Sequence, residues 1–218
     1  MDDTLRNMII ASIVLVLVAL YGGQTLGSWF VVSGELEDTD SSDSIDFEAT
    51  FNLEGYEYEL SIRDGGSKEK QDGKIDYDDN DCSSPDYDGG SDCDEMYDLM
   101  DGKIKNLLYI VLLAGGVALY FLNDGDQEKG ALACLAMGSA GLLAVALFTI
   151  SFPEALDDDT DAFEVIDDDP SIIGDNNNFG EEFSGSLDSE VNWRPGFAFA
   201  LVGLSGILGM AAYFELKN

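Results

Sequence analysis

Four long apolar runs constrain this chain more than any other feature of its sequence. A helix needs about 20 residues to cross the hydrocarbon core of a bilayer, and each run is long enough. The third and fourth contain no Asp, Glu, Lys or Arg. We therefore predict membrane-spanning helices at residues 1–28, 104–122, 130–152 and 195–214, so that the lipid bilayer itself is a partner of this chain.

The segments between these runs differ greatly in length. An acidic loop at 29–103 and another at 153–194 alternate with a short connection at 123–129 and a tail at 215–218. Basic residues orient membrane proteins by staying in the cytoplasm. Arg6, Lys129 and Lys217 give the short segments the higher density of basic residues. We expect a multi-pass protein of the cell membrane with both termini cytoplasmic and both large loops extracellular.

A cleavable signal peptide is the alternative interpretation of the first run. Arg6 precedes the apolar stretch, and small residues follow at Gly22 and Gly23. No cleavage site of the Ala-x-Ala type is present, and apolar residues continue beyond Gly23. We therefore expect the run to remain as a helix.

The first large loop carries a strand pattern. Apolar residues alternate with polar ones over 45–53 and again over 56–62, on either side of Glu54-Gly55. A two-residue turn there predicts a hairpin with one apolar face. The segment 29–36 is the best candidate for a third strand. The predicted cross-strand pairs are Leu53 with Tyr56, Phe51 with Tyr58, Ala49 with Leu60, and Phe47 with Ile62.

The composition of charged residues argues against some classes of partner and of activity. The net charge is −34, from 44 acidic and 10 basic residues, which argues against nucleic acid as a partner. Histidine is absent, so the commonest general base is missing. No carboxylate has an identifiable partner in an apolar setting, and we expect neither catalysis nor a small-molecule substrate.

Cys82 and Cys93 are the cysteines outside the apolar runs. In an oxidising extracellular loop they are expected to form a structural disulfide. A metal pair is the alternative, but it lacks further Cys or His ligands. Cys134, in the third run, is expected to pack as a small apolar residue.

Asp76, Asp78 and Asp81 place oxygen ligands near one another, as calcium prefers. The run does not fit the EF-hand pattern, because its sixth position is Asp81 instead of Gly. The alternative to a specific calcium site is a diffuse atmosphere of cations around an acidic loop. No other cofactor is expected.

Glycines recur on the last apolar run at Gly203, Gly206 and Gly209. Small residues let transmembrane helices approach closely. The line is either a contact within one bundle or a face that meets a second copy or another membrane protein.

Trp29 soon after the first run, a cysteine pair in a large first loop that also carries strands, and a small second loop together resemble the claudin-like tetraspan superfamily. The Gly-Leu-Trp element of that family is missing here, and Cys82 and Cys93 are eleven residues apart, where about ten is usual. Tetraspanins, whose second loop is the larger and carries Cys-Cys-Gly, match less well. The resemblance implies a left-handed four-helix bundle with a small extracellular sheet, and adhesion, paracellular or auxiliary-subunit roles.

The function expected from all this is structural. We predict a non-enzymatic membrane protein whose acidic extracellular domain contacts partner proteins or the cell envelope. The alternatives are a cation-binding or permeation element and an auxiliary subunit of a larger complex. The acidity and the absence of Asn-x-Ser/Thr sequons favour a prokaryotic source.

Overall fold

The computed structural model describes residues 3–38, 44–64, 67–77, 94–160 and 187–217. The chain divides into two compact units. One comprises 1–29, 98–152 and 195–218 and is helical, and the other comprises 30–97 and 153–194 and contains the sheet. Each unit therefore combines segments that are far apart in the sequence.

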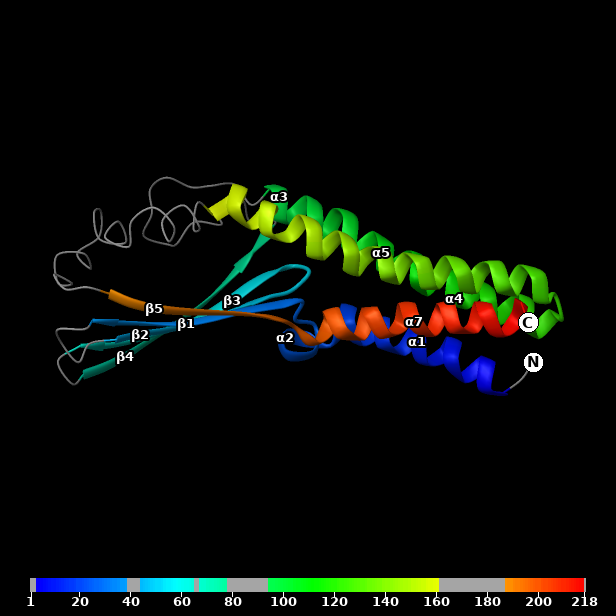
Figure 1. Ribbon diagram of the computed structural model, residues 1–218, viewed down its shortest axis with the longest axis horizontal. Coiled ribbons are helices and arrows are strands. Elements are labelled where there is room, and N and C mark those ends of the chain that lie inside the picture. The colour runs from blue at the N-terminus through cyan, green and yellow to red at the C-terminus, as the bar shows by residue number, and fades with distance from the viewer. Residues whose placement is uncertain (1–2, 39–43, 65–66, 78–93, 161–186, 218) are drawn as a thin grey trace. The chain divides into compact units, whose positions relative to one another are not determined.

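Four helices of the first unit lie side by side (Figure 1). They are α1 (Asp3–Tyr21), α4 (Lys105–Asp124), α5 (Gln127–Thr160) and α7 (Phe197–Lys217), with the short α2 (Gly23–Leu26) after α1. Among the residues that the structure describes, four helical stretches are long and apolar enough to cross a membrane: Asp3–Tyr21, Asp94–Asp124, Gln127–Ala155 and Phe197–Lys217. The prediction of four such helices is confirmed.

Several helix boundaries differ from those expected. α5 continues to Thr160, where the sequence predicts loop from residue 153. A helical stretch of α3 (Asp94–Tyr97) and the π-helical segment η2 (Asp98–Ile104) leads into α4, where the sequence predicts loop up to residue 103. Met96, Leu99 and Met100 are buried there, so apolar packing extends the helix. Between α4 and α5 only Gly125 and Asp126 remain outside a helix, because Gly125, at φ +87°, ends α4.

Contacts between neighbouring helices define the bundle. α1 packs against α4 and against α7. Gly130 of α5 faces Leu122 of α4, and Gly206 of α7 faces Leu142 of α5. The four helices therefore form a ring in which chain order is also spatial order, and which α7 closes against α1.

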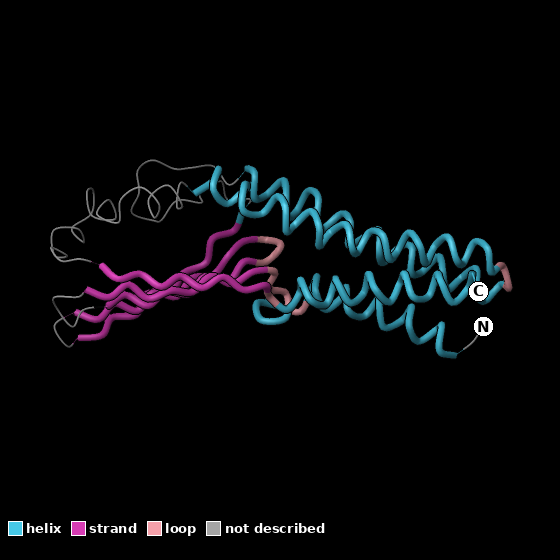
Figure 2. The backbone as a smooth tube through the Cα atoms, viewed as in Figure 1, coloured by secondary structure: helices cyan, strands magenta, loops and turns pink. Residues whose placement is uncertain are grey.

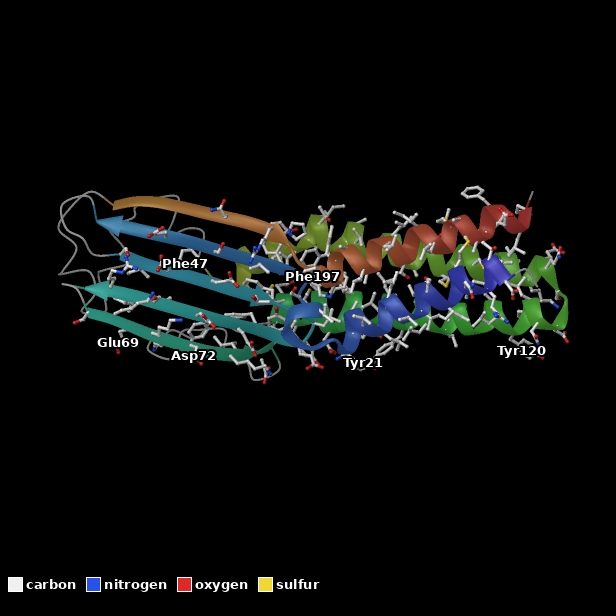
Figure 3. The ribbon with its side chains drawn as sticks, turned by 90° about the horizontal axis from the view of Figure 1, so that it is seen from below. Tyr21, Phe47, Glu69, Asp72, Tyr120 and Phe197 are labelled. Atoms are coloured by element: carbon white, nitrogen blue, oxygen red, sulfur yellow. The ribbon has the colours of Figure 1, made fainter. Side chains whose placement is uncertain are left out.

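The outward surface of the bundle is apolar. Leu113 is 71% exposed and Ile150 is 74% exposed. Tyr120 and Phe197, labelled in Figure 3, are 67% and 60% exposed. Patches of this kind are rare on monomeric soluble proteins and are usual where lipid surrounds a helix. Large exposed apolar residues occur on all four helices: Ile10, Val14, Leu17, Leu113, Val117, Leu132, Leu143, Ile150, Leu204 and Ile207.

The second unit contains a five-stranded sheet in the order β4-β3-β2-β1-β5. Its strands are drawn in magenta in Figure 2. The strands are β1 (Phe30–Asp38), β2 (Ser44–Phe51), β3 (Gly55–Asp64), β4 (Ser67–Asp76) and β5 (Leu187–Pro195). The first four form a meander of antiparallel pairs. The expected hairpin and third strand are both present.

The register of the hairpin was predicted wrongly by two residues. Phe51 lies opposite Tyr56 and Phe47 lies opposite Leu60. The side chain of Asn52 moves the turn, because its Oδ1 accepts hydrogen bonds from the backbone N–H of Glu54 at 2.8 Å and of Gly55 at 3.0 Å. Since the shift is an even number, every side chain keeps its predicted face.

Two strands were not predicted. β4, Ser-Lys-Glu-Lys-Gln-Asp-Gly-Lys-Ile-Asp, has almost no apolar alternation, yet it pairs with β3 over its whole length. Its charges suit an exposed edge, where they discourage pairing with other chains. β5 comes from the second large loop and pairs with β1, so both loops build one sheet.

Candidate functional site

One face of the sheet is polar and carries the candidate site. Side chains that lie directly opposite on paired strands share a face, so Ser33, Glu48, Glu59 and Asp72 form one row across β1 to β4. This face contains a concave groove of about 440 Å³. Its lining residues are Ser33, Gly34, Glu35, Asp46, Phe47, Glu48, Glu59, Ser61, Lys68, Lys70 and Asn192, which come from all five strands.

Carboxylates occupy the middle of the groove. Glu48 lies opposite Glu59, and Glu35 lies opposite Asp46. We call these four residues the carboxylate group. Like charges directly opposite one another destabilise a sheet, so this arrangement does not serve the stability of the fold. Arg194 of β5 reaches Glu48, with its Nη2 3.4 Å from Oε2, and both side chains are exposed.

Basic residues occupy the β4 end of the same face. Lys68 lies opposite Arg63, and Lys70 lies opposite Ser61. All three cations are exposed. We call Arg63, Lys68 and Lys70 the basic cluster. The polar face is therefore divided into an anionic middle and a cationic edge.

Asp76, one of the predicted calcium ligands, forms an ion pair with Lys74 of the same strand. The hydrogen bond from Lys74 to Asp76 raises the pKa of the lysine above its ordinary 10.5. Asp78 and Asp81 lie outside the described residues. In the described part of the chain, no three or more His, Cys, Asp or Glu side chains are grouped as metal ligands. The calcium site stays a prediction.

Of the three cysteines, one lies within the described residues and two do not. Cys82 and Cys93 lie outside the described residues, so their disulfide stays a prediction. Cys134 is a free thiol that is buried in α5, as a small apolar residue would be.

The glycine line of α7 lies partly inside the bundle. A Cβ added to Gly209 would meet the backbone of Gly138 in α5 at 2.6 Å, and one added to Gly206 would meet Leu142 at 2.9 Å. A Cβ on Gly203 would approach only Val145, at 3.8 Å. Gly206 and Gly209 therefore serve a contact within the chain.

Sequence reasoning missed the contacts around Ser28, which follows α2. Ser28 accepts hydrogen bonds from the first backbone N–H groups of α7: its Oγ from Phe197 at 3.2 Å and its backbone oxygen from Ala198 at 2.7 Å. Trp29 is fully buried and packs on Phe148, with ring centroids 5.2 Å apart. A serine before a tryptophan gives no sign in the sequence that it caps a helix that begins 169 residues later.

Comparison with models of known protein families and with curated proteins finds no match to this chain. The resemblance to claudin-like proteins therefore depends on Trp29, on the cysteine pair and on the order of helices and strands. The function has to be inferred from the geometry of the groove and of the bundle.

Proposed function

We propose that this chain is a non-enzymatic, multi-pass membrane protein that presents its sheet outside the cell as a docking surface for a partner protein. In this proposal the four long helices cross the bilayer and both termini lie in the cytoplasm. The observation that carries the proposal is the groove on the polar face, where all five strands contribute side chains and opposite charges are separated.

The apolar outward surface of the bundle supports the membrane location. Contact of such residues with lipid has no free-energy cost, whereas their exposure to water does. Inside the bundle, small residues let the helices approach closely, as they do in membrane proteins. The antiparallel sheet that follows the first helix agrees with the claudin-like resemblance, and an adhesive role is the version of docking that this resemblance favours.

The chemistry of the groove favours binding over catalysis. Glu48 and Glu59 are exposed. A general acid or base needs a pKa matched to its task, and enzymes obtain it by placing the group in an apolar or desolvated setting. Separated patches of opposite charge instead orient two proteins at an interface and make the interface selective for one partner.

A photoreactive residue at Glu59 tests the proposal in native membranes. Glu69, exposed on the opposite face of the neighbouring strand, is the matched control position. We expect a discrete adduct from position 59 that is absent from position 69 and weakens as salt is raised. Equal adducts from both faces, or none from either, would contradict a docking role for the polar face.

A further inference from the structure

The ion pairs of this chain are distributed unevenly. Acidic residues outnumber basic ones by 44 to 10, so a carboxylate is available for nearly every cation. In the described part of the chain, Arg63, Lys68, Lys70 and Lys217 nevertheless make no ion pair. Lys217 stands alone at the end of α7, whereas the other three lie together on the sheet and form the basic cluster. The basic residues that do make ion pairs are Arg6, Lys74, Lys103, Lys105, Lys129 and Arg194.

The sheet register places these three cations together. Arg63 and Lys68 lie directly opposite each other, and Lys70 follows two residues later on the same face of β4. A directly opposed pair of like charges destabilises the sheet. The cluster therefore has an electrostatic cost that the fold does not require.

Protection of the sheet edge does not account for the cluster. Edge protection needs lysines on β4 only, whereas Arg63 lies on β3, an inner strand. Lys74 forms an ion pair with Asp76, two positions later on the same strand. Lys70 has the same spacing to Asp72, yet no ion pair forms between them.

We propose that the basic cluster binds an acidic segment of the partner protein, an inference that depends on the docking role proposed above. Three exposed cations on two strands match carboxylates along an extended peptide, and the guanidinium of Arg63 can bind a carboxylate through two hydrogen bonds. Lys68 and Lys70 also line the groove beside the carboxylate group. A protein can present both signs of charge to this face, whereas an anionic bilayer would be repelled by the carboxylates.

The test uses the full chain in neutral detergent micelles and a fluorescent peptide of ten aspartates. We expect the wild-type chain to bind the peptide despite a net charge of −34. A variant with Arg63→Gln, Lys68→Gln and Lys70→Gln should bind it about tenfold more weakly or worse. The matched control, Arg6→Gln with Lys129→Gln and Lys217→Gln, loses the same one arginine and two lysines from the helical unit and should bind as the wild type does.

Two results would overturn the inference directly. One is a wild-type chain that does not bind the peptide, and the other is an equal loss of binding in both triple variants, which would mean that only the total charge matters. Phosphatidylglycerol vesicles that displace the peptide better than an equal charge of free deca-aspartate would identify lipid as the ligand instead. If the adduct from position 59 is unchanged in the cluster variant, the docking role stands while this inference fails.

Discussion

Ser12 of α1 and Ser205 of α7 meet inside the bundle, where their Oγ atoms lie 2.6 Å apart. The hydroxyl of Ser12 is also 3.0 Å from the backbone oxygen of Ser205. Both side chains are fully buried. This pair connects the first long helix to the last one and helps to close the ring.

The serine pair is expected to contribute to the stability of the bundle. Ser12→Ala or Ser205→Ala should each lower the free energy of unfolding by about 1 kcal/mol, because hydrogen bonds between helices in a membrane are modest. The double variant should lose less than the sum of the two. Unfolding of the full chain in increasing dodecyl sulfate measures all three. Strictly additive losses would mean that the two hydroxyls do not interact.

The glycines of α7 are expected to respond differently to the same substitution. Gly209→Ala should destabilise the bundle by about 1–3 kcal/mol, because the new Cβ would meet the backbone of Gly138, which cannot move aside. Gly203→Ala, whose Cβ would have ordinary contact at 3.8 Å, is the matched control and should be neutral. Equal losses in the same unfolding assay would contradict the packing of α5 against α7.

The helices could be predicted closely from the sequence, but their contacts could not. Runs of apolar residues identify membrane-crossing helices because the bilayer fixes their length. The spacing of Gly203, Gly206 and Gly209 shows that close packing is possible, but it does not show which helix approaches. In the same way, Ser12 and Ser205 are polar residues in apolar runs, and nothing local indicates that they pair.

The hairpin register can be tested with cysteine pairs in a chain whose native cysteines are replaced by serine. Phe47→Cys with Leu60→Cys should oxidise faster than Phe47→Cys with Ile62→Cys, because the first pair lies directly opposite and the second lies on a diagonal. Gel mobility under oxidising conditions distinguishes the two rates. Faster disulfide formation in the second pair would support the register predicted from the sequence.

This register illustrates a general limit of strand patterns. Alternation over 45–62 determines which side chains share a face, and that part was predicted. It does not distinguish registers that differ by two residues, because both keep the same faces. The amide of Asn52 decides between them, and the charged strand β4 and the distant strand β5 bring the basic cluster and Arg194 to the groove. β4 has almost no apolar alternation that would predict it. In β5, Leu187, Val191 and Trp193 do alternate with polar residues, but this pattern does not show that the strand pairs with β1.

The connection between α4 and α5 gives a pH prediction. Asp126 accepts a hydrogen bond from the backbone N–H of Lys129 at 3.1 Å and pairs with its side chain at 2.7 Å. The side chain of Lys129, and then its backbone N–H, lower the pKa of Asp126 below its ordinary 3.8. The stabilisation by this carboxylate is therefore present above pH 3.8 and is lost as the pH falls through the lowered value.

Carboxyl resonances of Asp126 in an NMR titration should have a midpoint below 3.8. Lys129→Met should move the midpoint upward, while Lys217→Met, the control, should leave it in place. Asp126→Asn keeps an oxygen that can cap α5. It should therefore remove the loss of stability at low pH without removing the helix. A midpoint that Lys129→Met leaves unchanged would mean that the pair does not form in solution.

The central claim is that the sheet lies outside the cell and that the α4–α5 connection lies inside. Single cysteines test it when Cys82, Cys93 and Cys134 are replaced by serine. Gln71→Cys in β4 and Glu128→Cys beside the connection both change exposed residues. With a membrane-impermeant maleimide, intact cells should be labelled at position 71 and should be labelled at position 128 only after permeabilisation. Labelling of intact cells at position 128 but not at position 71 would contradict the claim.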